Sequence, residues 1–237
     1  MALFPVATSV LSAEGSPAAA TVAGVRIKFC GLTRAADVEA ACALGVDAIG
    51  FNLARGPRRI DLAHAVELAR YVAPGVTVVL LVVDAPETTV LAAFDAVATA
   101  LGSSARIAIQ LHGNEPPAFA VALRRHCPVV KAFAGPSGLD AAHGYPADAV
   151  LIDAPAPGND TAKGGGAGES WNYRAMVGAG LATPLILAGG LTPDNVADAV
   201  HIVRPWAVDV ASGIESAPAL KDPARMAAFV AAVRSVG

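Results

Sequence analysis

A cysteine and an aspartate stand at the ends of two strand-like segments that are far apart in the chain. Cys30 follows the β-branched segment that begins at Val25, and Asp153 closes the apolar run Val150-Leu151-Ile152. A cysteine thiolate is a reactive group, and a carboxylate at the end of a strand in a mostly apolar barrel can have a raised pKa and act as an acid. A strand-end cysteine is often only a buried residue, and an aspartate in a loop is often only a helix cap.

Lys28 favours the catalytic interpretation of Cys30. It lies two residues earlier, so both side chains point to the same side of a strand. A nearby cation is expected to lower the pKa of the Cys30 thiol and to supply thiolate near neutral pH. Cys42, in an alanine-rich helix, and Cys127, before a proline, are interpreted as structural residues.

The elements that must position these residues alternate regularly from residue 25 onward. Strands are expected over 25–29, 47–51, 76–83, 106–110, 129–132, 149–152, 184–187 and 206–208. Helices are expected over 34–44, 62–71, 86–100, 116–125, near 139, and over 171–177, 192–200 and 223–236, with Thr33 as a helix cap. Eight strand–helix units favour a closed (β/α)8 TIM barrel over an open doubly wound sheet. We expect one domain over 24–237, preceded by a flexible extension over 1–23.

In such a barrel the site lies where the strands end. Three glycine features fall after the last strands: the run 164–168, the pair Gly189-Gly190, and Ser212-Gly213. Glycine lets backbone N–H groups approach an anion closely, and barrels often hold phosphate at these loops. The positions predict a phosphorylated small molecule as ligand.

Composition excludes several other classes of protein. The 237 residues are 54% hydrophobic and carry a net charge of −3, with no clustered basic excess of the kind that nucleic-acid binding requires. The longest strongly apolar run, Val76–Val83, is far shorter than the roughly 20 residues of a membrane span. Three cysteines without CxxC spacing argue against a disulfide framework or a zinc site, so we expect no metal or cofactor and a cytoplasmic location.

The segment Lys28-Phe-Cys30-Gly31-Leu-Thr33 resembles the K-x-C-G signature in the first strand of the phosphoribosylanthranilate isomerases of tryptophan biosynthesis. The resemblance runs from Val25 to the C-terminus, with matching motifs at most strand ends. They include Pro57-Arg58, Gln110-Leu-His-Gly113, Val130-Lys-Ala132, Leu151-Ile-Asp-Ala154, Gly165-Gly-Ala-Gly168, Leu187–Val196 and Val208–Glu215.

The resemblance implies an Amadori rearrangement of N-(5′-phosphoribosyl)anthranilate to the carboxyphenylamino-deoxyribulose phosphate. Asp153 would be the general acid that opens the sugar ring, and Cys30 the general base. Arg58, with Arg59 as the alternative, would bind the anthranilate carboxylate. Further substrate contacts are expected from Lys28, Gln110, His112, Lys131 and Asp209, and phosphate contacts from Gly166, Gly168, Gly189, Gly190, Ser212 and Gly213.

Two rival functions are weighed against this one. Other enzymes of the same fold, the histidine-pathway sugar isomerase and the tryptophan synthase α chain, use two carboxylates, and Cys30 argues against both. A barrel that only binds or regulates is disfavoured because Cys30, Asp153 and the glycines are all retained. The sequence leaves monomer and homodimer open.

Overall fold

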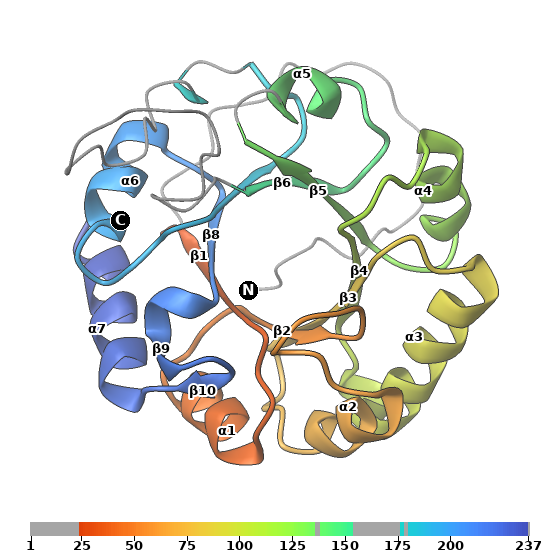
Figure 1. Ribbon diagram of the computed structural model, residues 1–237, viewed down its shortest axis with the longest axis horizontal. Coiled ribbons are helices and arrows are strands. Elements are labelled where there is room, and N and C mark those ends of the chain that lie inside the picture. The colour runs from red at the N-terminus through yellow and green to blue at the C-terminus, as the bar shows by residue number, and fades with distance from the viewer. Residues whose placement is uncertain (1–23, 136–137, 154–175, 178–179, 237) are drawn as a thin grey trace.

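The structure is a computed structural model, which describes residues 24–135, 138–153, 176–177 and 180–236 (Figure 1). Eight parallel strands form a closed barrel in the order β1 to β8, and β1 pairs with β8. The helices lie outside the ring of strands (Figure 1). The predicted TIM barrel is confirmed, and the open sheet is excluded.

The elements run as follows. The barrel strands are β1 (Arg26–Cys30), β2 (Ala48–Asn52), β3 (Thr77–Val82), β4 (Ile107–Leu111), β5 (Val129–Ala134), β6 (Ala149–Asp153), β7 (Leu185–Ala188) and β8 (Ala207–Val210). The helices are α1 (Ala35–Ala43), α2 (Leu62–Ala69), α3 (Glu87–Leu101), α4 (Pro117–Leu123), α5 (Gly138–Ala142), α6 (Val196–Val203) and α7 (Pro223–Arg234), with short 3-10 turns η1 (Gly102–Ser104) and η3 (Ser212–Ile214). A small antiparallel hairpin, β9 (Glu215–Ala217) and β10 (Leu220–Lys221), follows η3.

Alternation along the strands divides the core into two parts. Small and branched side chains such as Ala108, Val130 and Ile186 fill the inside of the barrel. A larger apolar layer, which includes Phe29, Ile109 and Phe229, lies between the strands and the surrounding helices. Because both faces of every strand are covered, the strands read as nearly continuous apolar runs, as is usual for parallel sheets.

Several boundaries differ from the expected ones. Cys30 and Asp209 lie within their strands, not after them. Thr33 does not cap α1, since its Oγ1 donates to the carbonyl oxygen of Ala219 at 3.0 Å and Arg34 occupies the cap position. The β9–β10 hairpin was not expected. The extension over 1–23 and most of the expected helix over 171–177 lie outside the described residues.

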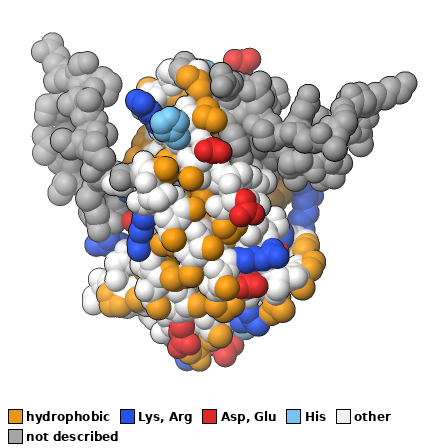
Figure 2. Space-filling view, turned by 90° about the vertical axis from the view of Figure 1, so that its left-hand side faces the viewer, with side chains coloured by type: hydrophobic (Ala, Val, Ile, Leu, Met, Phe, Trp, Pro, Cys, Tyr) orange, Lys and Arg blue, Asp and Glu red, His pale blue; other side chains and the backbone are white. Residues whose placement is uncertain are grey.

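Surface and helix lengths add two observations on the described part of the chain. None of its helices has the length and apolarity needed to cross a membrane. On the face shown in Figure 2, basic and acidic side chains of the described residues are interspersed, without a large patch of one sign.

Candidate active site

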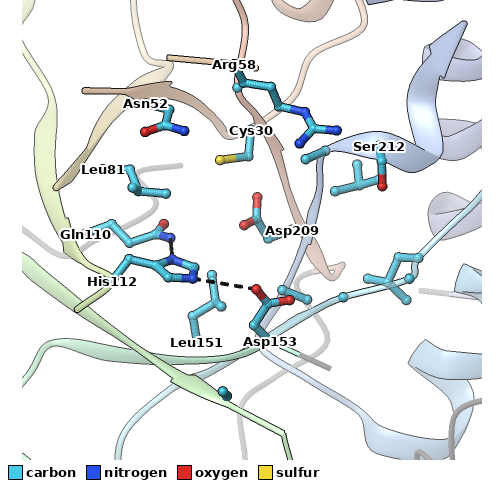
Figure 3. A pocket seen from close by; sticks show the side chains of 18 of the residues that line it. Cys30, Asn52, Arg58, Leu81, Gln110, His112, Leu151, Asp153, Asp209 and Ser212 are labelled. Atoms are coloured by element: carbon cyan, nitrogen blue, oxygen red, sulfur yellow. Dashed lines mark hydrogen bonds and ion pairs between the residues drawn. The ribbon is translucent and has the colours of Figure 1, made fainter. Parts of the chain in front are cut away.

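A cavity of about 700 Å³ lies at the carboxyl ends of the barrel strands (Figure 3). It brings together most of the residues that the sequence singled out. Those that line it are Cys30, Arg58, Gln110, His112, Asp153, Gly189, Gly190, Asp209 and Ser212. Asn52, Leu81 and Leu151 also line the cavity, and none of these three was assigned a role from the sequence.

Cys30 and Lys28 both face the inside of the barrel, as their spacing predicted. A Cβ atom placed on Gly50 of β2 would lie 2.9 Å from the Cys30 Sγ and 3.4 Å from the Lys28 Cε. Glycine at position 50 therefore gives these two side chains their room. The Lys28 ammonium is 1% exposed and donates to the Asp209 Oδ1 at 2.9 Å.

The pKa of the Cys30 thiol does not follow the expectation from the sequence. Burial raises this pKa above its usual value, and the charge of Asp209 adds to the rise. The cations Lys28 and Lys221 oppose the shift but do not outweigh it. Lys28 is itself desolvated, yet Asp209 and Cys30 hold its pKa above the usual range, so it remains an ammonium. The sequence showed the cation but not the burial, and burial dominates here.

Asp153 faces His112 across the barrel mouth. The His112 Nε2 lies 3.6 Å from the Asp153 Oδ2, and the Gln110 Nε2 lies 3.1 Å from the His112 Nδ1. If the Gln110 amide donates to Nδ1, the neutral ring carries its proton on Nε2, directed at the Asp153 carboxylate. The Gln110 Oε1 is buried and has no hydrogen-bond partner among the described residues.

Arg58 reaches the cavity from the loop between β2 and α2. Its Nε and Nη2 donate to the two carboxylate oxygens of Glu215, each at 2.7 Å. Gly31, the residue after Cys30, makes the approach possible. Gly31 has a φ of 71°, and a Cβ at this position would lie 2.5 Å from the Arg58 Cδ. The glycine of the K-x-C-G segment is therefore needed for the arginine as well as for the turn.

A buried lysine lies behind this arginine. The Lys221 Nζ donates to the carbonyl oxygens of Cys30 at 2.7 Å and Ala211 at 2.9 Å, and to the Glu215 Oε1 at 2.8 Å. Burial would raise the pKa of Glu215, but the hydrogen bonds from Arg58 and Lys221 hold it below its usual value. Neither Glu215 nor Lys221 was assigned a role from the sequence.

Two turns near the last strands carry the predicted phosphate-binding residues. Gly189 and Gly190 both have positive φ, at 86° and 63°, and the Asn195 side chain donates to the Gly190 carbonyl at 2.9 Å. Gly213 lies so close to the Leu191 carbonyl that any Cβ there would collide with it. Gly166 and Gly168, also predicted for this site, lie outside the described residues.

Lys131 is placed differently from the expectation. Its neighbours Val130 and Ala132 fill the barrel interior, so Lys131 points outward beneath the helices. Its Nζ donates to the Gly113 carbonyl at 2.6 Å and to the Glu115 Oε2 at 3.1 Å, and it does not line the cavity. This buried pair fastens the loop after β4. The placement argues against a substrate contact, and Lys131 is left out of the proposed site.

The comparisons with known proteins agree with this geometry. Residues 27–232 match the family model described as N-(5′-phosphoribosyl)anthranilate (PRA) isomerase. The chain belongs to the N-(5′-phosphoribosyl)anthranilate isomerase family. The family member of Methylibium petroleiphilum is 44% identical over 214 residues, which cover 88% of this chain and 93% of the relative. That of Myxococcus xanthus is 41% identical, with coverage of 90% and 97%.

Solved structures of the family share the barrel. The phosphoribosylanthranilate isomerase of Thermotoga maritima has a TM-score of 0.77 at 29% identity, with 89% of this chain and 99% of that chain covered. A complex of such an isomerase with reduced 1-(o-carboxyphenylamino)-1-deoxyribulose 5-phosphate has a TM-score of 0.76 at 27% identity, with the same coverage. The family, the fold and the isomerase function expected from the sequence are confirmed.

Proposed function

We propose that Cys30 and Asp153 are the base and the acid of the isomerisation of N-(5′-phosphoribosyl)anthranilate. The observation that carries the assignment is that the two side chains enter one cavity from different walls, Cys30 from β1 and Asp153 from β6. In the view of Figure 3 they lie on either side of Asp209. A substrate in this cavity can meet a proton donor and a proton acceptor at different atoms.

The reaction divides into two proton transfers. Asp153, protonated, donates to the ring oxygen of the sugar while the bond from this oxygen to C1 breaks and the anthranilate nitrogen forms a C1=N bond. The Cys30 thiolate then removes the proton from C2, and the electrons of the C–H bond form C1=C2 and return charge to nitrogen. The resulting enolamine gains a proton at C1 and loses one from the C2 hydroxyl, which gives the ketone. Each positioned acid or base typically contributes about 10²- to 10⁴-fold to such a rate.

His112 and Gln110 fit supporting roles beside Asp153. The His112 ring lies between the Gln110 amide and the Asp153 carboxylate, so its orientation is fixed from one side. The Gln110 side chain lines the cavity, while its Oε1 is buried and has no hydrogen-bond partner among the described residues.

The two ends of the substrate are assigned to different groups of residues at the mouth. Arg58 would bind the anthranilate carboxylate through a charge-assisted fork. The phosphate would be bound by the backbone N–H groups of Gly189, Gly190, Ser212 and Gly213. Gly166 and Gly168 are assigned to the same phosphate from the sequence alone. Asp209 keeps a carboxylate oxygen for a sugar hydroxyl because Lys28 hydrogen-bonds the other.

The direct test follows the loss of substrate fluorescence. Cys30→Ser and Asp153→Asn should each lower kcat by at least about 10²-fold. Cys42→Ser is the matched control, because Cys42 is half-buried outside the cavity, and it should turn over at the wild-type rate. Full activity in both site variants, or none in the wild type, would overturn the assignment.

We propose further that residues 24–237 form the one catalytic domain, with 1–23 as an extension that the reaction does not require. Support comes from the closed ring of strands, which begins at Arg26 and is complete without earlier residues. A cytoplasmic location is consistent with three unpaired cysteines. A chain that begins at Gly24 should keep full turnover, and light scattering on both chains would decide between monomer and homodimer.

A further inference from the structure

A cluster of charged side chains lies behind the cavity wall, under the β9–β10 hairpin. Glu215 is 6% exposed and Lys221 is 2% exposed. All three protons of the Lys221 ammonium are used, two by the carbonyls of Cys30 and Ala211 and one by Glu215. Lys221 therefore joins the end of β1, the end of β8 and the carboxylate of β9 at one point. Glu215 in turn contacts Arg58, a residue of the cavity wall.

The way in which Glu215 holds Arg58 determines which part of the guanidinium remains available. A guanidinium offers five N–H groups in two forks, one through Nε and Nη2 and one through Nη1 and Nη2. Glu215 occupies the first fork. The Nη1 has no hydrogen-bond partner among the described residues, so the second fork, at the tip of the side chain, is left for a ligand. Figure 3 shows the guanidinium extending past Cys30 on the Ser212 side of the cavity.

We propose that Glu215 and Lys221 are positioning residues for substrate recognition, which present the tip of Arg58 to a planar carboxylate and hold it in a fixed relation to Cys30. This inference rests on the proposed role of Arg58 and deepens it. Glu215 sets the rotation of the guanidinium about its stem. Lys221 fixes Glu215 and, through the Cys30 carbonyl, the backbone of the base. A bidentate contact requires such orientation, because both N–H groups must align with both oxygens at once.

The barrel contains a second buried pair that serves as a comparison. Glu115 and Lys131 are also buried and bonded at 3.1 Å, but they lie under the loops after β3 and β4. Neither touches Arg58 or Cys30 in the structure. If buried Lys–Glu pairs here contribute only to stability, the two pairs should behave alike in kinetic tests. If Glu215 acts through Arg58, only the Glu215 pair should be coupled to that arginine.

The test is a double-mutant cycle on KM for N-(5′-phosphoribosyl)anthranilate with Arg58→Ala and Glu215→Gln. Arg58→Ala should raise KM about 10- to 100-fold, as expected for loss of a hydrogen-bonded charge. Glu215→Gln should raise KM about 5- to 10-fold with kcat within about threefold of wild type, since a contact to a remote substrate group acts mainly on binding. In the Arg58→Ala background Glu215→Gln should change KM less than about twofold, because no guanidinium remains to be oriented. Glu115→Gln in the same cycle is the control. The KM of the Glu115→Gln, Arg58→Ala double variant should rise by the product of the two single fold-changes, because the two residues are not in contact.

A substrate analogue without the carboxylate, N-(5′-phosphoribosyl)aniline, provides the second readout. With this analogue Glu215→Gln should leave KM at the wild-type value. Circular dichroism and thermal melting check that each variant is folded. If Glu215→Gln does not fold, Glu215→Asp takes its place. The aspartate keeps a negative charge beside Lys221, but its shorter side chain moves the carboxylate away from Arg58.

The outcomes separate the two levels of inference. An unchanged KM in Arg58→Ala contradicts the proposed carboxylate contact itself. A large KM effect of Arg58→Ala, combined with an undiminished effect of Glu215→Gln in that background, contradicts the positioning role and leaves the contact standing. An equal KM increase for the aniline analogue would also overturn the positioning role.

Discussion

The Lys221 Nζ donates a 2.7 Å hydrogen bond to the backbone carbonyl oxygen of Cys30, a residue 191 positions earlier in the chain. The bond joins the hairpin after the last strand of the barrel to the end of the first. Because β1 and β8 are also paired in the sheet, Lys221 reinforces the seam at which the barrel closes. The residue proposed as the base is therefore held by a side chain from the opposite end of the sequence.

Replacement of Lys221 by Met should destabilise the fold strongly. The change leaves the carbonyls of Cys30 and Ala211 without their donor and removes one partner of the buried Glu215 carboxylate. Removal of one partner from a buried ion pair typically costs about 3–5 kcal/mol. Urea denaturation would measure the loss. Arg204→Met, at an exposed helix end, is the control. A loss below about 1 kcal/mol for Lys221→Met would show that the hydrogen bonds of Lys221 do not support the fold.

Acid should destabilise the protein through Glu215 and Glu115. Burial raises the pKa of each carboxyl, but hydrogen bonds outweigh it: Arg58 and Lys221 at Glu215, and backbone N–H groups with Lys131 at Glu115. The pKa of each group is thus lower when folded than the value of about 4.3 in an unfolded chain. Their stabilisation is complete above this value and is lost as the pH falls through the folded values. Thermal melting from pH 6 to pH 2.5 should show a shallower acid limb in Glu215→Gln than in the wild type, and equal limbs would contradict the prediction.

Gly31→Ala should impair both stability and substrate binding. The residue has a φ of 71°, and a new Cβ would lie 2.5 Å from a stem carbon of Arg58, whose far end is held by Glu215. We expect a loss of about 1–3 kcal/mol from the backbone strain, and a higher KM because Arg58 must move. Gly75→Ala is the matched control, since its φ is 95° but nothing lies within 4 Å of the added Cβ. It should lose stability alone, and a wild-type KM in Gly31→Ala would show that Arg58 is not displaced.

The pH dependence of kcat/KM should report the burial of Cys30. Burial raises the pKa of its thiol above the usual value of about 8.5, despite the opposing charges of Lys28 and Lys221. The thiolate fraction, and with it kcat/KM, should still be rising as the pH passes this value. Alkylation by iodoacetamide, followed by peptide mapping, should rise with the same midpoint at Cys30. Cys127, whose pKa burial raises to about 12, should stay unmodified over this range, and a kcat/KM midpoint below pH 8 would contradict the prediction.

Most of the fold was predictable because each strand–helix unit carries its own local signal. Apolar runs such as Val78–Val82 predict a strand, and residues such as Gly75 predict a turn, from the local sequence alone. The rule that barrel sites lie at the strand ends then assembled Cys30, Asp153 and Asp209 without any contact information. The residues that line the cavity largely follow from this rule.

The errors arise where the outcome depended on contacts between distant segments. Lys131 was expected at a strand end, but it lies in the middle of β5, and the alternation of side chains along the strand turns it away from the interior. Thr33 precedes a helix, yet its hydroxyl is taken by Ala219 of the hairpin, 186 residues later. Lys221-Asp222-Pro223 reads as an ordinary polar helix start, and Asp222 does cap α7. Nothing local distinguishes the buried Lys221 from its exposed neighbours, because its burial is created by the loop ends that it joins.

The hydrogen bond from Lys221 to the Cys30 carbonyl also imposes an order on the synthesis and folding of the enzyme. Synthesis produces Cys30 early and Lys221 near the end, so the base receives its last support only when the final hairpin has been made and docked. A nascent or truncated chain that lacks residue 221 has no donor for this hydrogen bond to the Cys30 carbonyl. Catalytic competence is therefore a property of the finished chain, and fragments that stop short of the hairpin should be inactive even where they are folded.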